Sequence, residues 1–406
     1  MDETTRKVRA MYEQYPYPAG TPQIRVQSDA RLLLSYVARS RPETGPLHVL
    51  DAGCGRGLGV IGSALTQPDV NFVAADMNRV ALQHARERAR AYGLQNIEFV
   101  ECDLMTLAEL PVPTGGYDVI YSLGVLHHLS DPVTGLQRLH SVLAPHGVIA
   151  FMVYAKYGRS ALTRLQEGVE LLFPDGEDLP RRIPAGRDLA RAASCSILAN
   201  TYWSDTADTH DIEFVDRCLN VNETTYDVTT LWDLLASADL RFLRWFEPDL
   251  WGLGQLPPGE VRDRASRLAA VDRYRLLERV TEQNAFELLL THTQNAPRER
   301  ISRDEVKRLS FALNPDISIC LETRTVRAGQ RIESLSYRLR HRDAVVVSEQ
   351  PLAEGLLLLR DQNGSFQGAE FVVAMLKQGV TQEMSTRILV DLLDREVLYS
   401  PHDTDL

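Results

Sequence analysis

Short apolar runs alternate with longer amphipathic stretches between residues 47 and 155, and this alternation restricts the fold more than any other feature. The apolar runs are rich in β-branched side chains and lie at 47–52, 71–76, 97–102, 117–122 and 148–155. Amphipathic stretches lie between them at 58–67, 79–92 and 132–143. Alternating strand and helix patterns of this kind predict a parallel sheet flanked by helices, which is an α/β fold.

A long insertion interrupts the alternation after residue 155. Helices are expected near 160–173 and 187–199, followed by a polar segment at 201–225. Further helices at 229–237 and 259–283 accompany the apolar runs 240–246 and 285–293. We expect these two runs to complete the same sheet, which would then be doubly wound, mostly parallel and seven-stranded.

A proline-containing break at 295–300 predicts a linker to a second unit. In that unit we expect strands at 334–341, 344–350 and 396–400 and short helices at 352–359, 368–377 and 381–393. This content suggests a small α+β, winged-helix-like domain. The expected division is an N-terminal arm or lid (1–46), a ligand-binding core (47–155), a helical insertion capping the substrate site (156–228), the end of the core (229–295) and the C-terminal domain (300–406).

Composition and charge exclude several classes of protein. The longest uninterrupted apolar run has eight residues, against ~20 for a membrane-spanning helix, and no signal-peptide pattern is present. We therefore expect a cytoplasmic protein without a membrane partner. The net charge is −11 and neither half of the chain has a basic excess, which argues against nucleic acid as a partner. The five cysteines lack a C-x-x-C pair, so reduced thiols and no bound metal are expected.

A glycine-rich turn follows the first predicted strand in the segment VLDAGCGRGLG at 49–59. It places Asp51 at the strand end and Gly53, Gly55 and Gly57 in the turn before a helix. Residues without a Cβ let the backbone approach a ligand closely, and the helix start offers unpaired N–H groups. The dinucleotide pattern G-x-G-x-x-G occurs too late, within the helix, so the turn does not match the dinucleotide fingerprint.

Two more aspartates close the next two predicted strands. Asp76 lies 23 residues after Gly53, where its carboxylate can accept both hydroxyls of a ribose. Asp103 closes the third strand and can accept a hydrogen bond from an adenine amino group. Met77 and Leu104 follow these aspartates and can supply apolar walls. The sequence therefore predicts a nucleoside site at this edge of the sheet.

With these elements, region 47–155 resembles the class I S-adenosylmethionine-dependent methyltransferases, which have a Rossmann-like fold. The fourth predicted strand and its continuation, DVIYSLGVLHHL at 118–129, also match that family. The resemblance implies S-adenosylmethionine as cofactor and S-adenosylhomocysteine as product. It places Leu123 beside the methionine part of the cofactor. No N/D-P-P-Y/F motif follows the fourth strand, so methylation of DNA bases or glutamine of that type is not supported.

Methyl transfer from a sulfonium is an in-line displacement, so a base is needed only when the acceptor arrives protonated. His127 and His128 follow the fourth strand, where they can touch the substrate or take its proton. They can equally cap or pack against the next helix. In the N-terminal arm, Tyr12, Tyr15 and Tyr17 lie with three prolines within residues 11–22, which favours a lid over cofactor and acceptor. An arm that only packs on the sheet is the alternative.

The polar segment of the insertion is a second candidate substrate site. Its candidate residues are His210, Asp211, Asn222, Glu223 and Tyr226. Because insertions after the fifth strand of this fold overhang the acceptor, a cluster of carboxylates there would suit a cationic amine. A metal site is less well supported, since no close pair of ligands repeats. A solvated loop is the alternative.

The whole layout is similar to multidomain bacterial protein-lysine methyltransferases. That similarity favours methylation of an amine on a protein lysine. Methylation of a small molecule on oxygen or nitrogen is the first alternative. A regulator that binds S-adenosylmethionine without catalysis is the second. The C-terminal domain is expected to bind protein or another subunit, which allows a homodimer.

Overall fold

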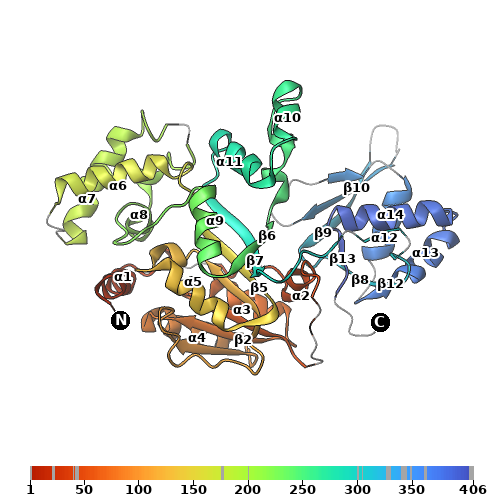
Figure 1. Cartoon of the computed structure of the whole chain (residues 1–406), viewed down its shortest axis with the longest axis horizontal. Helices are drawn as coiled ribbons and strands as arrows, with labels where there is room; N and C mark the ends of the chain where they lie inside the picture. Colours follow the sequence, from red (N-terminus) through yellow and green to blue (C-terminus); the bar gives the residue numbers. More distant parts are fainter. Residues whose placement is uncertain are drawn as a thin grey trace. The chain divides into compact units, whose positions relative to one another are not determined.

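The computed structural model describes residues 2–20, 23–39, 41, 45–174, 178–199, 201–299, 301–303, 305–325, 331–339, 345–347, 350–360 and 364–401. The chain packs as two compact units. Unit 1 comprises 1–27 and 45–295, and unit 2 comprises 28–44 and 296–406. Figure 1 labels many of the helices and strands of both units.

Unit 1 contains a seven-stranded sheet in the order β3-β2-β1-β4-β5-β7-β6. Its strands are β1 (His48–Ala52), β2 (Asn71–Asp76), β3 (Ile97–Glu101), β4 (Tyr117–Leu123), β5 (Leu143–Tyr154), β6 (Leu240–Trp245) and β7 (Ala285–His292). Neighbouring strands are parallel from β3 to β5, and β7 is antiparallel to both β5 and β6. The predicted doubly wound, mostly parallel α/β sheet is thereby confirmed.

Helices α3 (Leu58–Thr66), α4 (Arg79–Ala91) and α5 (Pro132–Ser141) connect the parallel strands. The side chains of Asn78 and Asp131 cap α4 and α5 by accepting hydrogen bonds from the first turn of each helix. The strand order reverses between β1 and β4, and α/β folds bind ligands at such a reversal, outside the carboxyl ends of the strands. The fold therefore puts the ends of β1, β2, β3 and β4 at one binding edge.

The insertion and the N-terminal helix share one hydrophobic cluster. The insertion contains α6 (Ser160–Leu172), α7 (Leu179–Ala193), η2 (Thr206–Asp208) and α8 (Asp211–Cys218). Met11 of α1 (Glu3–Gln14) is buried with Leu162 and Phe214. In Figure 1, α1 lies near α8, below the insertion. The N-terminal arm thus packs against the insertion.

One expectation and one alternative for this part of the chain were wrong. The helix expected at 187–199 is α7, which begins at Leu179 because Pro180 lies in the first turn, where no N–H partner is required. Residues 175–177, which precede α7, lie outside the described residues. The polar segment is no solvated loop, since α8 buries Phe214 and Val215.

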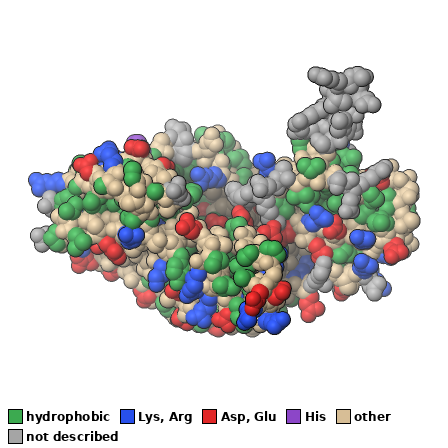
Figure 2. All heavy atoms as spheres, turned by 90° about the horizontal axis from the view of Figure 1, so that it is seen from above, with side chains coloured by type: hydrophobic (Ala, Val, Ile, Leu, Met, Phe, Trp, Pro, Cys, Tyr) green, Lys and Arg blue, Asp and Glu red, His purple; other side chains and the backbone are tan. Residues whose placement is uncertain are grey.

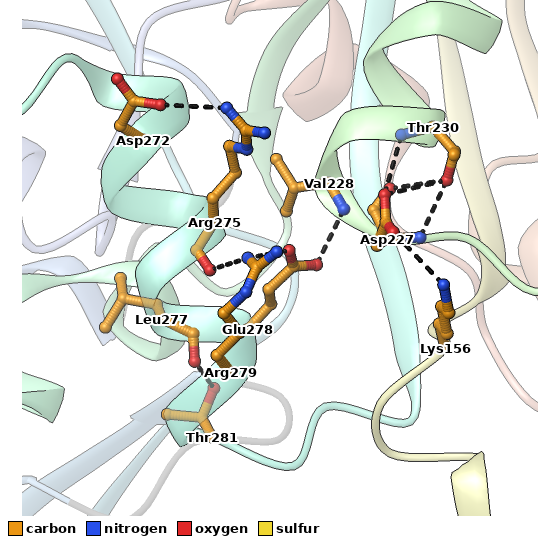
Figure 3. Close-up of polar contacts among 10 residues, drawn as sticks. All are labelled: Lys156, Asp227, Val228, Thr230, Asp272, Arg275, Leu277, Glu278, Arg279 and Thr281. Atoms are coloured by element: carbon orange, nitrogen blue, oxygen red, sulfur yellow. Dashed lines mark hydrogen bonds and ion pairs between the residues drawn. The ribbon is translucent and has the colours of Figure 1, made fainter.

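The single helix expected at 259–283 is two helices, α10 (Glu260–Ala265) and α11 (Ala270–Val280). The backbone at Ala269 is extended, although the intervening residues are compatible with a helix, so tertiary packing outweighs propensity here. α11 buries Glu278, whose Oε2 accepts the N–H of Val228 at 2.7 Å. Figure 3 shows this contact at the start of α9 (Val228–Ser237), beside the Asp227 cap and its ion pair with Lys156. Short helices η1 (Leu126–His128), η3 (Pro248–Trp251) and η4 (Leu253–Gln255) complete unit 1.

The described part of unit 2 has two small antiparallel sheets, one short helix and three longer helices. One sheet is β12 (Phe366–Gln367), β8 (Ser310–Leu313) and β13 (Leu398–Tyr399), and the other is β11 (Val345–Val347), β10 (Arg331–Leu339) and β9 (Ile317–Thr325). The helices are α2 (Ala30–Leu34), α12 (Gln350–Arg360), α13 (Gly368–Lys377) and α14 (Gln382–Asp394). The three expected helices and the strands at 334–341, 344–350 and 396–400 are present in the described part. Residues 300, 340–344, 348 and 349 lie outside it.

The winged-helix-like character of this unit and the five domain boundaries remain predictions. Within the described residues, no helix combines the length and apolar character needed to cross a membrane. On the face shown in Figure 2, acidic and basic side chains are interspersed among apolar ones.

Candidate active site

The glycine-rich turn is tied to the neighbouring strand by its backbone. The N–H groups of Gly53 and Cys54 both donate to the carbonyl of Ala75 in β2, at 2.8 and 3.0 Å. Gly53, Gly55 and Gly57 have φ angles of +88°, +52° and +72°, in the left-handed region that disfavours other residues. The turn therefore depends on its glycines for conformation.

The surroundings of the three glycines differ: Gly53 and Gly57 are packed closely against other residues, whereas Gly55 leaves room for a ligand. A Cβ added to Gly53 would lie 2.4 Å from a methyl group of Val125, and one added to Gly57 would lie 2.8 Å from the Cβ of Ala85. A Cβ added to Gly55 meets no heavy atom within 4 Å. Gly55 therefore borders open space at the binding edge, which is the space a nucleoside cofactor would fill.

Asp76 ends β2 directly opposite this turn. Its carboxylate accepts the N–H of Gly55 at 2.7 Å and the N–H of Asn78 at 2.8 Å. Burial raises the pKa of Asp76, while these backbone hydrogen bonds act to lower it. The half-buried Met77 follows, so the carboxylate of Asp76 and an apolar side chain are adjacent in the chain.

The remaining predicted cofactor residues lie at the same edge. Asp103 follows β3 and accepts the N–H of Met105 at 2.9 Å, with Leu104 buried beside it. Leu123 ends β4 and is 38% exposed. Asp51 in β1 is buried, accepts a hydrogen bond from Gln27 at 3.3 Å, and has a pKa that burial raises to about 7. The structure thus brings together all nine residues assigned to the cofactor.

Replacing Gly55 by alanine tests the open space. Gly93 is the matched control because its φ is +70° and an added Cβ there also meets no atom within 4 Å. Both variants should lose a similar, small amount of stability, about 1 kcal/mol, from backbone strain. Only Gly55→Ala should weaken S-adenosylmethionine binding, by tenfold or more in calorimetric titration. Equal affinities of the two variants for S-adenosylmethionine would show that the cofactor does not occupy this space.

His127 and His128 lie in η1, immediately after β4. His127 is fully buried, and neither ring nitrogen has a hydrogen-bond partner among the described residues. Its ring stacks on Tyr154 with centroids 3.8 Å apart. Burial, and then the charges of His128 and Arg159, lower the pKa of His127 well below its usual value. His127 is therefore a neutral group at physiological pH.

His128 is oriented by the insertion, since its Nδ1 lies 2.9 Å from the carbonyl oxygen of Asn222. The side-chain amide of Asn222 donates to the carbonyls of His128 and Leu129 at 3.1 and 2.8 Å. Burial lowers the pKa of His128. Asp131 caps α5, so neither histidine is the cap of that helix. Asn222 of the insertion thus holds the segment after β4 by hydrogen bonds.

A polar cluster joins the arm to the insertion. The hydroxyl of Tyr12 donates to Oδ1 of Asp216 at 2.8 Å and accepts from the amide of Asn220 at 3.1 Å. Arg159, 2% exposed, donates to both carboxylate oxygens of Glu223, 6% exposed, at 3.0 and 2.9 Å. The guanidinium of Arg159 also lies 3.6 Å from the ring centroid of Tyr154.

The arm also reaches the glycine turn. Arg56, within the turn, donates to the carbonyl of Pro18 at 2.9 Å, and the N–H of Ala19 donates to Glu213 of α8 at 3.4 Å. Tyr17, partly exposed, has a pKa raised to about 12 by desolvation and by the charges of Asp216 and Glu213. The segment after α1 therefore runs between the insertion and the cofactor edge, which supports its role as a lid.

Several predicted substrate residues have other surroundings. His210 accepts the N–H of Ile212 at the start of α8, and Asp211 is ion-paired with Arg187 at 2.8 Å. Tyr226 is buried in the sheet core, where its N–H donates to the carbonyl of Tyr154. Tyr15 packs against the insertion cluster, and burial raises its pKa.

Sequence reasoning did not select Tyr154, Arg159, Asp216 or Asn220. In the sequence, Tyr154 looks like the last residue of a core strand, and nothing distinguishes Arg159 from the many other arginines. The two others were visible only as members of a polar segment. Among the described residues, no three His, Cys, Asp or Glu side chains are placed to hold a metal ion.

Comparisons with known proteins agree with this geometry. A family model described as a methyltransferase domain matches residues 44–171. An uncharacterized protein of Synechococcus sp. is 31% identical over 297 residues, covering 68% of this chain and 69% of that protein. The tRNA 5-carboxymethoxyuridine methyltransferase of Escherichia coli is 36% identical over 122 residues, covering 29% of this chain and 44% of that enzyme. The chain spans about half the length of the named curated methyltransferases it matches.

Among solved structures, PKMT2 from Rickettsia typhi in complex with AdoHcy has a similar fold. Its TM-score is 0.65 at 16% identity, covering 94% of this chain and 77% of that chain. The glycine turn, the aspartates at the strand ends and these matches define a class of enzyme. This chain belongs to the class I S-adenosylmethionine-dependent methyltransferases, and its cofactor is S-adenosylmethionine.

Proposed function

We propose that this enzyme transfers the methyl group to an amine nitrogen, and that the acceptor is the side chain of a protein lysine. The observation that carries the proposal is the group of tyrosines beyond the end of β4. Tyr12 is hydrogen-bonded to Asp216, and the charge of Asp216 also contributes to the raised pKa of both Tyr17 and Tyr154. Three phenols and a carboxylate therefore share one small region of the acceptor side.

Such surroundings favour a cationic acceptor over a neutral or acidic one. A carboxylate attracts an ammonium group, whereas an acidic acceptor would meet like charge. The charge of Arg159 also reaches this region and lowers the pKa of Asp216, but Glu223 balances it, so Arg159, Glu223 and Asp216 together remain negative.

The layout supports a protein as the carrier of that amine. The sequence resembles multidomain bacterial protein-lysine methyltransferases in the arm, the insertion and the C-terminal domain. The likeness to PKMT2 extends over 94% of this chain, so it includes more than the catalytic core. The proposal also includes the cytoplasmic location and a C-terminal domain that contacts protein, either the substrate or a second copy in a homodimer.

The reaction requires that the acceptor nitrogen is aligned with the methyl group and that its lone pair is free. The nitrogen lone pair attacks the methyl carbon in line with the breaking carbon–sulfur bond, whose electrons remain on sulfur. S-Adenosylmethionine supplies the electrophilic methyl group. This chain's own residues must exclude water, orient the acceptor and remove a proton when the acceptor is an ammonium.

The test is incubation of the full chain with cell lysate and S-adenosylmethionine carrying an isotopically labelled methyl group. We expect label on discrete protein bands, located on lysine by mass spectrometry. A lysate whose lysines have been acetylated should lose that label. Label confined to small molecules, or found on oxygen, would contradict the proposal. Cofactor binding without any transfer would point to the regulatory alternative.

A further inference from the structure

Asp216 occupies an unusual position in the insertion. It lies on α8 and is 7% exposed. Its Oδ1 accepts from Tyr12, and among the described residues no hydrogen bond is made to Oδ2. Since Asn220 donates to the same tyrosine hydroxyl, the Tyr12 proton is committed to Asp216. The carboxylate is therefore held in place with one oxygen available.

No cation within the described residues is paired with this carboxylate. Arg159 is bound to Glu223 at 2.9 Å, and Arg217 of α8 is bound to Asp205 at 2.9 Å. The charges of both arginines still reach Asp216 and lower its pKa. The other titratable groups that face Asp216 are Glu213 and Cys218 of α8, Tyr17 of the arm and Tyr154 of β5. A buried carboxylate without a paired cation is costly, and a bound ammonium would remove that cost.

His127 gives independent evidence of a ligand nearby. It is fully buried with both ring nitrogens unpartnered, which is rare for a polar side chain in a folded protein. Its ring contacts Tyr154 and lies 4.2 Å from that of His128, which in turn lies 6.1 Å from that of Tyr12. His127, His128, Tyr12 and Asp216 are thus successive neighbours, and His127 is the one without a hydrogen-bond partner among the described residues.

We propose that Oδ2 of Asp216 binds the protonated acceptor amine and takes one proton from it before methyl transfer. This inference rests on the proposed function, since it requires an ammonium as the acceptor. The N–H bond breaks, the proton forms an O–H bond on Asp216, and the freed lone pair attacks the methyl carbon. The products are a methylated ammonium and S-adenosylhomocysteine, and Asp216 then releases its proton to water.

The pKa of Asp216 suits this task. Burial raises it to about 6, so the group is still ionised at neutral pH and is a stronger base than an ordinary aspartate. Burial of the amine in the same region lowers the pKa of the ammonium. Burial thus brings the pKa values of the two groups closer together, while the attraction between their charges acts in the opposite direction on both.

The test compares Asp216→Asn with wild type, using as acceptor the lysate protein fraction that wild type labels. Asparagine keeps the volume and can still accept from Tyr12, so folding should persist and S-adenosylmethionine affinity should be unchanged. We expect the methylation rate at neutral pH to fall about 100-fold or more. The wild-type rate should rise through pH 6, and this step should be missing in the variant. At pH values above the amine's own pKa the difference should shrink.

Asp188→Asn is the control, because it removes an exposed carboxylate of the same insertion, which is paired with Arg191. It should keep the wild-type rate and pH profile. Tyr12→Phe should give a smaller loss than Asp216→Asn, since the charge remains. An Asp216→Asn enzyme with wild-type rate and pH profile would overturn this inference while leaving amine methylation intact. Label on a non-amine atom in wild type would instead overturn the proposed function.

Discussion

Replacing Arg159 by methionine is expected to lower the free energy of unfolding by about 3–5 kcal/mol. The guanidinium and the Glu223 carboxylate are both buried and joined by two-pronged hydrogen bonds. Removing the arginine leaves Glu223 charged and unpaired in the interior, and it also withdraws the cation from the face of Tyr154. Urea denaturation of the full chain measures the change.

Two further variants make this result specific. Adding Glu223→Gln to Arg159→Met should recover much of the loss, because the stranded charge is gone. Arg191→Met breaks an exposed pair with Asp188 and should cost less than about 1 kcal/mol. Equal losses for Arg159→Met and Arg191→Met would show that the ion pair with Glu223 does not support the insertion.

Replacing Asp76 by alanine is expected to weaken S-adenosylmethionine binding about 100-fold. Two hydrogen bonds from a ribose to a carboxylate contribute about 3 kcal/mol together, and each 1.4 kcal/mol corresponds to a factor of ten. The variant also frees the N–H of Gly55, so the glycine turn loses a support. Equilibrium dialysis with labelled cofactor measures the affinity.

Glu98→Ala is the matched control for this prediction, since Glu98 is an exposed carboxylate on the neighbouring strand β3. It should bind the cofactor like wild type. Unchanged affinity in Asp76→Ala would mean that the ribose lies elsewhere.

The core fold and the cofactor edge could be predicted from the sequence because both depend on local patterns. A strand in a parallel sheet reads as a short apolar run, and its end is marked by the next polar residue or glycine. Asp51, Asp76 and Asp103 each follow such a run, so the fold itself brings them to one edge. No long-range contact had to be known.

The acceptor side could not be predicted in the same way. Tyr12 and Asp216 are 204 residues apart, and nothing in either segment marks the other as its partner. Glu223 looked available for an amine, but it is occupied by Arg159, whose approach depends on how the loop after β5 folds. The choice among several carboxylates in a polar segment is made by tertiary packing.

The arm divides in a manner that sequence patterning also does not reveal. Residues 1–27 belong to unit 1, whereas 28–44 belong to unit 2. Within unit 2, Ala38 donates to the carbonyl of Ala296 at 2.9 Å, and Val37 bridges Pro297. A short stretch before the first strand thus pairs with the segment that follows the last strand of the large sheet.

Calorimetric titration of the full chain with S-adenosylmethionine tests whether the glycine turn is a cofactor site. We predict saturable binding of one cofactor per chain, with binding weakened by Gly55→Ala and Asp76→Ala but not by Gly93→Ala or Glu98→Ala. A chain that is folded, as judged by circular dichroism, and yet gives no binding would contradict the assignment of this edge of the sheet to the methyl donor.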